Sequence, residues 1–112
     1  MKAEISFSEF ESVDLRVGVI CYAAVSEKAK VPAFKLTIDF GHLGIRTSSA
    51  RITDLYEPSQ LIGKQIIALV NVPPRQVASV VSQCLVLGVV PADGKVVLLQ
   101  PDPGALPGDS VA

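Results

Sequence analysis

The chain has 112 residues, of which 49% are hydrophobic and 19% are charged, and its formal net charge is −1. This length fits a single domain over residues 1–112 with ample material for a core. The near-neutral balance argues against a protein that binds nucleic acid through overall charge alone, and no apolar run reaches the ~18 residues of a membrane span, so no membrane insertion is expected. The low charged fraction predicts that a second copy of the chain covers part of the apolar surface, as in a homodimer.

The basic residues gather in the middle of the chain. Residues 15–92 hold eight Lys and Arg against four Asp and Glu, whereas both ends are acidic. This distribution can produce a local basic face. A solvated surface with scattered charges remains an equally good interpretation.

Two cysteines, Cys21 and Cys84, lie within apolar strand patterns without the spacing of a metal or redox motif. They are expected to be reduced core residues rather than a disulfide or a metal pair. This cysteine usage, with no apolar leader at the N-terminus, fits a reducing cytoplasm.

The first elements are a short helix and a long strand. Ser6 and Glu9 form the pattern of a capping box, which predicts a helix over about residues 7–12. So short a helix needs to dock on the domain or on a partner. Apolar residues then alternate with polar ones over residues 13–25, which predicts a half-buried strand, and Gly18 within it indicates a bulge or a close backbone approach.

A hairpin follows a charged loop at residues 26–30. Residues 34–40 alternate cleanly between apolar and polar, Gly41 to Gly44 turn the chain, and residues 45–50 return as a third strand. Arg46 and Ser48 are expected on its outer face, next to Lys35 on the preceding strand. This outer face is therefore available to a ligand.

The second half predicts a barrel that closes with short strands. Residues 51–63 have the pattern of one or two helical turns that end at a glycine. Strands are predicted at residues 64–70, 80–90 and 95–99, with Asp93 and Gly94 forming a hairpin turn. The Pro-rich tail from residue 100 is irregular, either loose or tied down over a sheet edge.

These elements define the fold class as all-β. Five main strands with a short sixth, a helical connector between the third and fourth, a short N-terminal helix and no βαβ repeat indicate an OB-fold, a partly open five-stranded barrel. OB-folds often bind oligonucleotides on strands two and three, but the fold alone does not fix the function.

No catalytic constellation is present, so an enzyme is not expected. The single histidine, His42, lies between turn glycines with no nucleophile beside it. One histidine and two distant cysteines do not make a zinc site, and the chain has no nucleotide-binding glycine motif. We therefore expect no metal and no cofactor.

Polar and basic residues that a core does not need are the candidates for binding. Pro73 and Pro74 cannot continue a central strand, so they predict a rigid bend that presents Asn71, Arg75 and Ser82 at one edge. A hydroxyl-rich strand end at residues 47–51 and a lysine cluster at Lys28, Lys30 and Lys35 are further candidates. Polar side chains at a strand edge and solubilising charge on a loop explain these last two features equally well.

Several of these segments together resemble the tRNA-binding OB-fold domain that occurs at the end of bacterial methionyl- and phenylalanyl-tRNA synthetases and in free-standing homodimers. They are residues 14–18 (DLRVG), 63–64 (GK) and 71–75 (NVPPR), with Ser82. Residues 30–36 (KVPAFKL), 38–41 (IDFG), 48–50 (SSA) and 97–102 (VLLQPD) are similar to a free-standing branch described as secretion-related chaperones.

The resemblance implies a homodimer that binds tRNA and, for the chaperone branch, unfolded or exported polypeptides. By position it implies RNA contacts at Ser49, Asn71, Arg75 and Ser82, to which the strand pattern adds Lys35, Arg46 and Arg51. Gln76, Ser79, Val81 and Cys84 depart from the pattern of the relatives, which leaves fewer cations near the site and predicts weaker RNA binding. The apolar residues that replace them favour peptide binding at Pro73, Pro74, Val80 and Val81, without ATP.

Overall fold

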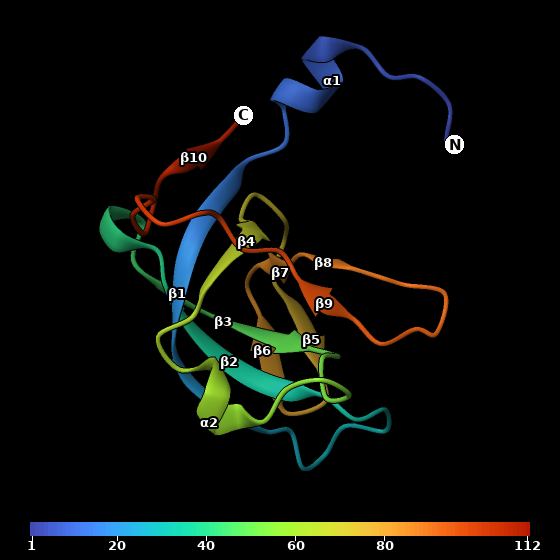
Figure 1. Cartoon of the computed structure of the whole chain (residues 1–112), viewed down its shortest axis with the longest axis vertical. Helices are drawn as coiled ribbons and strands as arrows, with labels where there is room; N and C mark the ends of the chain where they lie inside the picture. Colours follow the sequence, from blue (N-terminus) through green and yellow to red (C-terminus); the bar gives the residue numbers. More distant parts are fainter.

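The computed structural model describes residues 1–112, and most of its strands form one curved antiparallel sheet. Its order is β3-β2-β1-β4-β7, with β10 paired to β1 (Figure 1). The strands of this sheet are β1 (Leu15–Val25), β2 (Phe34–Asp39), β3 (Ile45–Ala50), β4 (Gln65–Leu69), β7 (Leu85–Val86) and β10 (Ser110–Val111). The sheet curls into a nearly closed barrel, which confirms the predicted OB-fold.

Two small hairpins and three helical segments complete the fold. The hairpins are β5 (Arg75–Val77) with β6 (Val80–Ser82), and β8 (Gly88–Val89) with β9 (Val97–Leu98). The helical segments are α1 (Phe7–Glu11), the 3₁₀ turn η1 (Gly41–Leu43) and α2 (Pro58–Leu61). The capping box of Ser6 and Glu9, the turn between β2 and β3 and the helical connector before β4 all lie where the sequence predicts them.

The predicted fifth strand at residues 80–90 is wrong as one element, because it is divided into β6, β7 and β8. The chain pairs in turn with β5, β4 and β9 as it crosses the barrel. The segment bonds to three different strands in turn, so it is interrupted at residues 83–84 and again at Leu87. None of the helices is long or apolar enough to cross a membrane.

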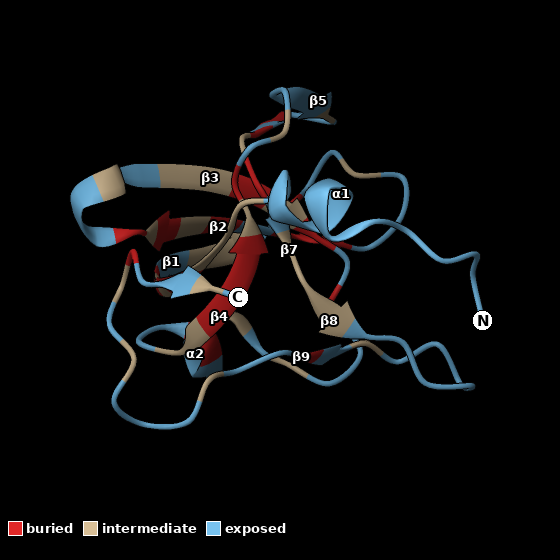
Figure 2. Cartoon of the chain, turned by 90° about the horizontal axis from the view of Figure 1, so that it is seen from above, coloured by how far each residue is buried: buried red, intermediate tan, exposed pale blue.

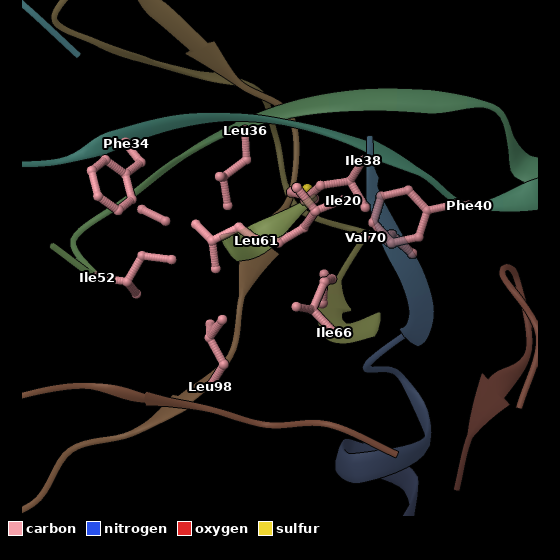
Figure 3. Packing of buried hydrophobic residues seen from close by; sticks show 13 residues of the cluster. Ile20, Phe34, Leu36, Ile38, Phe40, Ile52, Leu61, Ile66, Val70 and Leu98 are labelled. Carbon is pink, nitrogen blue, oxygen red and sulfur yellow. The ribbon is translucent and has the colours of Figure 1, made fainter. Parts of the chain in front are cut away.

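A cluster of 13 buried residues fills the barrel (Figure 3). Leu36 and Ile38 on β2 are fully buried, as the alternation of that strand predicts. Leu61 of α2 is also fully buried and lies in the middle of the labelled cluster, near Leu36 (Figure 3). The helical connector therefore completes the core.

Gly18 leaves room for core side chains from the neighbouring strand β2 and the residue that follows it. A Cβ at this position would lie 2.5 Å from Cγ2 of Ile38 and 2.8 Å from Cε1 of Phe40. The bulge in β1 lies elsewhere, between Ile20 and Tyr22, where the register with β2 shifts. This bulge turns Cys21 outward, so its predicted place in the core is wrong, whereas Cys84 is buried as expected.

The two ends of the chain differ in how they are held. The tail follows β1: the amide of Val17 donates to the carbonyl of Asp109 at 3.0 Å, and β10 pairs with β1. In contrast, α1 stands away from the barrel and buries none of its residues (Figures 1 and 2). Phe7 is 87% exposed, so the apolar face of α1 is unpartnered within the chain.

Replacing Gly18 by Ala is expected to destabilise the barrel by about 1–3 kcal/mol, because the added methyl overpacks the core. Urea unfolding of the two proteins measures this difference. Ile38→Leu removes the closest methyl, so the double variant Gly18→Ala/Ile38→Leu should lose less stability than the sum of the single variants. Strict additivity would show that Cγ2 of Ile38 is not what excludes a side chain at position 18.

Candidate nucleic-acid interface

Two neighbouring cavities lie beside the β5–β6 hairpin, and both include Ser49. The first, here called the proline cavity, has a volume of about 480 Å³ and is lined by Ser49, Val72, Pro73, Pro74, Arg75, Ser82, Cys84 and Leu85. The second, here called the lysine cavity, has a volume of about 270 Å³ and is lined by Lys28, Ala29, Lys30, Val31, Ala33, Ser49, Arg51, Val77 and Ala78. The proline cavity thus brings together Ser49, Arg75 and Ser82 with both prolines, and Arg51 lines the other cavity.

The Pro-Pro bend positions Arg75 at the start of a hairpin. β4 ends at Leu69, the prolines carry the chain round, and β5 begins at Arg75, which pairs with Ser82 on β6. The turn of this hairpin is only Ala78 and Ser79, and Ala78 adopts a φ of 54°. This φ is unusual for a residue with a side chain, so the hairpin tip is strained.

Arg75 and Lys35 keep free charges. The single ion pair of the protein joins Arg16 and Asp14, at 2.7 Å. Lys35 is exposed on β2, directly opposite Ser49 on β3, and Arg75 is exposed beside Pro74. Both cations, together with Arg51, are therefore available to neutralise an anionic ligand.

The sequence predicts Ser82 on the outer face, and this is wrong. Ser82 is buried, with 9% of its surface exposed. Its Oγ accepts a hydrogen bond from the amide of Ser49 at 3.1 Å and lies 3.3 Å from Oγ of Ser48. Ser48, also expected to point outward, is fully buried and donates to the carbonyl of Cys84 at 3.2 Å. A buried hydroxyl is tolerated when its hydrogen bonds are satisfied, and here they join β3 to β6.

Arg46 also lies on the inner face, contrary to expectation. It pairs with Ile38 across the β2–β3 ladder, and its Nη1 donates to the carbonyl of Val70 at 2.6 Å. The guanidinium therefore anchors the chain just before the Pro-Pro bend. Burial raises the pKa of the nearby Cys84 thiol to about 11, and the positive charge of Arg46 opposes part of this rise. Cys84 is thus a neutral thiol in the wall of the proline cavity at physiological pH.

Asn71 lies outside both cavities, and its side chain is used within the chain. Its Nδ2 donates to the carbonyl of Ser12 at 2.6 Å, and its Oδ1 accepts from the amide of Asp14 at 2.9 Å. These bonds fix the link between α1 and β1. Both contacts are with the backbone of this chain, and the RNA contact expected of Asn71 stays a prediction.

The valines predicted for peptide binding divide between the two faces of β6. Val80 is only 2% exposed, so its expected place in an exposed patch is wrong. Val81 is 45% exposed and lies opposite Gln76 on β5. The strand alternation of β6 explains the difference, because successive side chains point to opposite faces.

Sequence reasoning missed three parts of this surface. Val72 and Leu85 supply apolar wall to the proline cavity. Gln83 joins β3 through hydrogen bonds with the backbone of Thr47, and an amide side chain within an apolar run was the available signal. The surface as a whole combines free cations, hydroxyls and a rigid apolar wall, which suits binding of an extended polyanion.

Comparison with known proteins identifies the family. A model described as "Putative tRNA binding domain" matches residues 15–110. Methionine–tRNA ligase of Methanococcoides burtonii is 37% identical over 107 residues, which are 96% of this chain and 16% of that enzyme. The chain therefore spans about a sixth of the length of such curated relatives.

Solved structures of free-standing proteins are similar over their whole length. The chaperone CsaA from Bacillus anthracis is 48% identical with a TM-score of 0.93, covering 98% of this chain and 100% of that one. The CsaA chaperone protein from Picrophilus torridus is 46% identical with a TM-score of 0.91, covering 97% of this chain and 100% of that one. The chain thus belongs to the tRNA-binding domain family and has a CsaA-like structure.

Proposed function

We propose that this protein is a CsaA-like homodimer that binds tRNA and also acts, without ATP, as an export-related chaperone for unfolded polypeptides in the cytoplasm, and that residues 1–112 work as one domain. The observation that carries the tRNA part is a set of free cations: Arg51 and Arg75 line two cavities that share Ser49, and Lys35 lies opposite Ser49 on β2. The family match supports the same ligand. A purely accessory tRNA-binding module with no chaperone role is the alternative.

In this proposal RNA lies across the β2–β3 face, with phosphates against the cations. Lys35 and Ser49 are opposite one another on this face, and Arg75 stands at the hairpin beside it. Ser82 contributes by fixing the amide of Ser49 and the hairpin position, whereas Arg46 and Asn71 hold the surrounding backbone. These three residues are thus positioning residues for the RNA site.

The chaperone role rests on apolar surface. Val81, Leu85 and the two prolines are exposed next to the cations. Such a surface can accept apolar side chains of an unfolded chain without sequence specificity. The structural similarity to proteins described as CsaA chaperones supports this second role.

The homodimer rests on the unpartnered N-terminal helix. Phe7, Phe10 and Val13 line a cavity of about 700 Å³ together with Val111 of the tail. All three are exposed large hydrophobic residues. A second subunit that packs here would bury them and would hold a helix too short to be stable alone.

The first prediction concerns tRNA affinity. If about three to five phosphates are contacted, the plot of log K against log salt should have a slope of about −3 to −5. Arg75→Ala should reduce the size of that slope by about one, whereas Lys95→Ala, a cation on the β8–β9 hairpin, should not. Filter binding over a salt series measures both. Affinity that does not depend on salt, or no binding at low salt, would remove the tRNA proposal.

The second prediction concerns the trade between the two ligands. Val81→Lys adds a cation and interrupts the apolar surface, so it should strengthen tRNA binding and weaken suppression of client aggregation together. Light scattering of a denatured client without ATP measures the second effect. Ile62→Lys, at an exposed apolar position at the end of α2, is the matched control. If Val81→Lys changes neither activity, the two ligands bind elsewhere.

The third prediction concerns assembly. Deleting residues 1–12, or the gentler double change Phe7→Ser/Phe10→Ser, should convert dimer to monomer or to aggregate, because each removes the apolar face of α1. Multi-angle light scattering measures the mass, with Leu55→Ser as an exposed control distant in sequence. A dimer that is unchanged in both variants would contradict the proposed interface.

A further inference from the structure

The lysine cavity contains two cations, Lys28 and Lys30, that the proposed tRNA contacts do not use. Lys28, Lys30 and Arg51 surround one hollow of about 270 Å³, and none of them forms an ion pair. Glu27, the carboxylate next to them in the chain, is exposed and forms no ion pair either. Three like charges therefore face one cavity without a counter-charge from the protein.

This arrangement suits an acceptor-rich anion as its ligand. Lysine and arginine side chains only donate hydrogen bonds, so a ligand that satisfies them must supply oxygen acceptors. A concave surface lined by one sign of charge also raises the local concentration of counter-ions. Ala78, at the strained turn of the hairpin, also lines this cavity. The cavity volume of about 270 Å³ suits a small anionic group.

The proline cavity has the opposite character, and Ser49 joins the two. Val72, Pro73, Pro74 and Leu85 give it an apolar wall, and Arg75 lies in the same lining. Taken together as one groove, the two cavities offer cations in each, the hydroxyl of Ser49 and an apolar wall. A nucleic-acid strand offers the matching sequence of groups, because an apolar base face alternates with anionic phosphates.

We propose, on the basis of the proposed tRNA binding, that the two cavities together hold an unpaired segment of RNA, with a phosphate in the lysine cavity and the neighbouring base in the proline cavity. Bases of a duplex are stacked and paired, so they cannot enter a side cavity, whereas an unpaired base can be turned out. No aromatic residue lines either cavity. Stacking is therefore absent, and the groove distinguishes single strand from duplex more strongly than one base from another.

An acidic peptide could also offer an apolar group beside an anion. RNA fits better because cations line both cavities, Lys28 and Lys30 in one and Arg75 in the other, with the apolar wall in the second. Cations in both cavities suit a base that is flanked by two phosphates. A peptide with one acidic residue has a single anion to satisfy the same groups.

The test measures fluorescence anisotropy of the full chain with three probes: a short unstructured RNA, its duplex, and an abasic strand of the same length. We expect the intact single strand to bind several-fold tighter than both others. Lys28→Ala/Lys30→Ala should weaken single-strand binding about tenfold at low salt and reduce the size of the salt slope by about 1.4. Lys64→Ala/Lys95→Ala removes the same charge from other surfaces and should change the slope much less. Thermal melting confirms that both double variants are folded.

Several outcomes would overturn the inference. Equal affinity for intact and abasic strands would exclude a base in the proline cavity, and tighter binding of the duplex would exclude an unpaired segment. Equal losses in the two double variants would show that only long-range charge acts. An unfolded acidic peptide that displaces the RNA and depends more strongly on Lys28 and Lys30 would assign the groove to polypeptide. If one of these outcomes is found while tRNA binding stays salt-dependent, only the inference fails and the proposed function stands. If the native chain binds no RNA at all, the inference and the proposed function both fail.

Discussion

The barrel depends on a seam that side chains close where the backbone ladder does not. The amide of Gln83 donates to the carbonyl of Thr47 at 2.8 Å, and Oε1 of Gln83 accepts from the amide of Thr47 at 2.9 Å. Thr47 on β3 is thus bonded both to the side chain and to the backbone of Gln83. Ser82 repeats the device by accepting from the amide of Ser49. Buried amides need hydrogen-bond partners, and Ser82 and Gln83 supply these partners for the amides at the edge of β3, where no neighbouring strand does.

This seam decides which polar groups remain for a ligand. Ser48, Ser82 and Gln83 use their side chains to close the barrel, and Arg46 uses its guanidinium to hold the carbonyl of Val70. The groups left unpaired are the cations at the rim and the side chain of Ser49. Recognition must therefore combine charge, shape and apolar contact, with few directed hydrogen bonds to a ligand. Such a surface suits ligands defined by a repeating backbone.

The sequence predicts what periodicity controls and fails where tertiary contacts override it. The alternation on β2 correctly places Leu36 and Ile38 in the core, and the clash at Gly18 follows from its position within a strand. Cys21 is misplaced because a bulge changes which face it occupies. Ser82 is misplaced because a polar side chain suggests exposure. Only the position of β3 shows that the amide of Ser49 can donate a hydrogen bond to the hydroxyl of Ser82. The Pro-Pro bend and Arg75 are predictable, because proline acts locally.

The rigid apolar wall and the flexible cations contribute to different steps of binding. Pro73 and Pro74 lose little conformational freedom when a ligand settles against them, so contacts there cost little entropy and should slow dissociation. Lys28, Lys30 and Lys35 are long and exposed, and ordering them offsets much of their attraction for phosphate. Their main contribution is then to the rate of encounter and to its salt dependence. A chain with net charge −1 still attracts a polyanion through such a face, because at physiological salt only charges within about 8 Å are felt strongly.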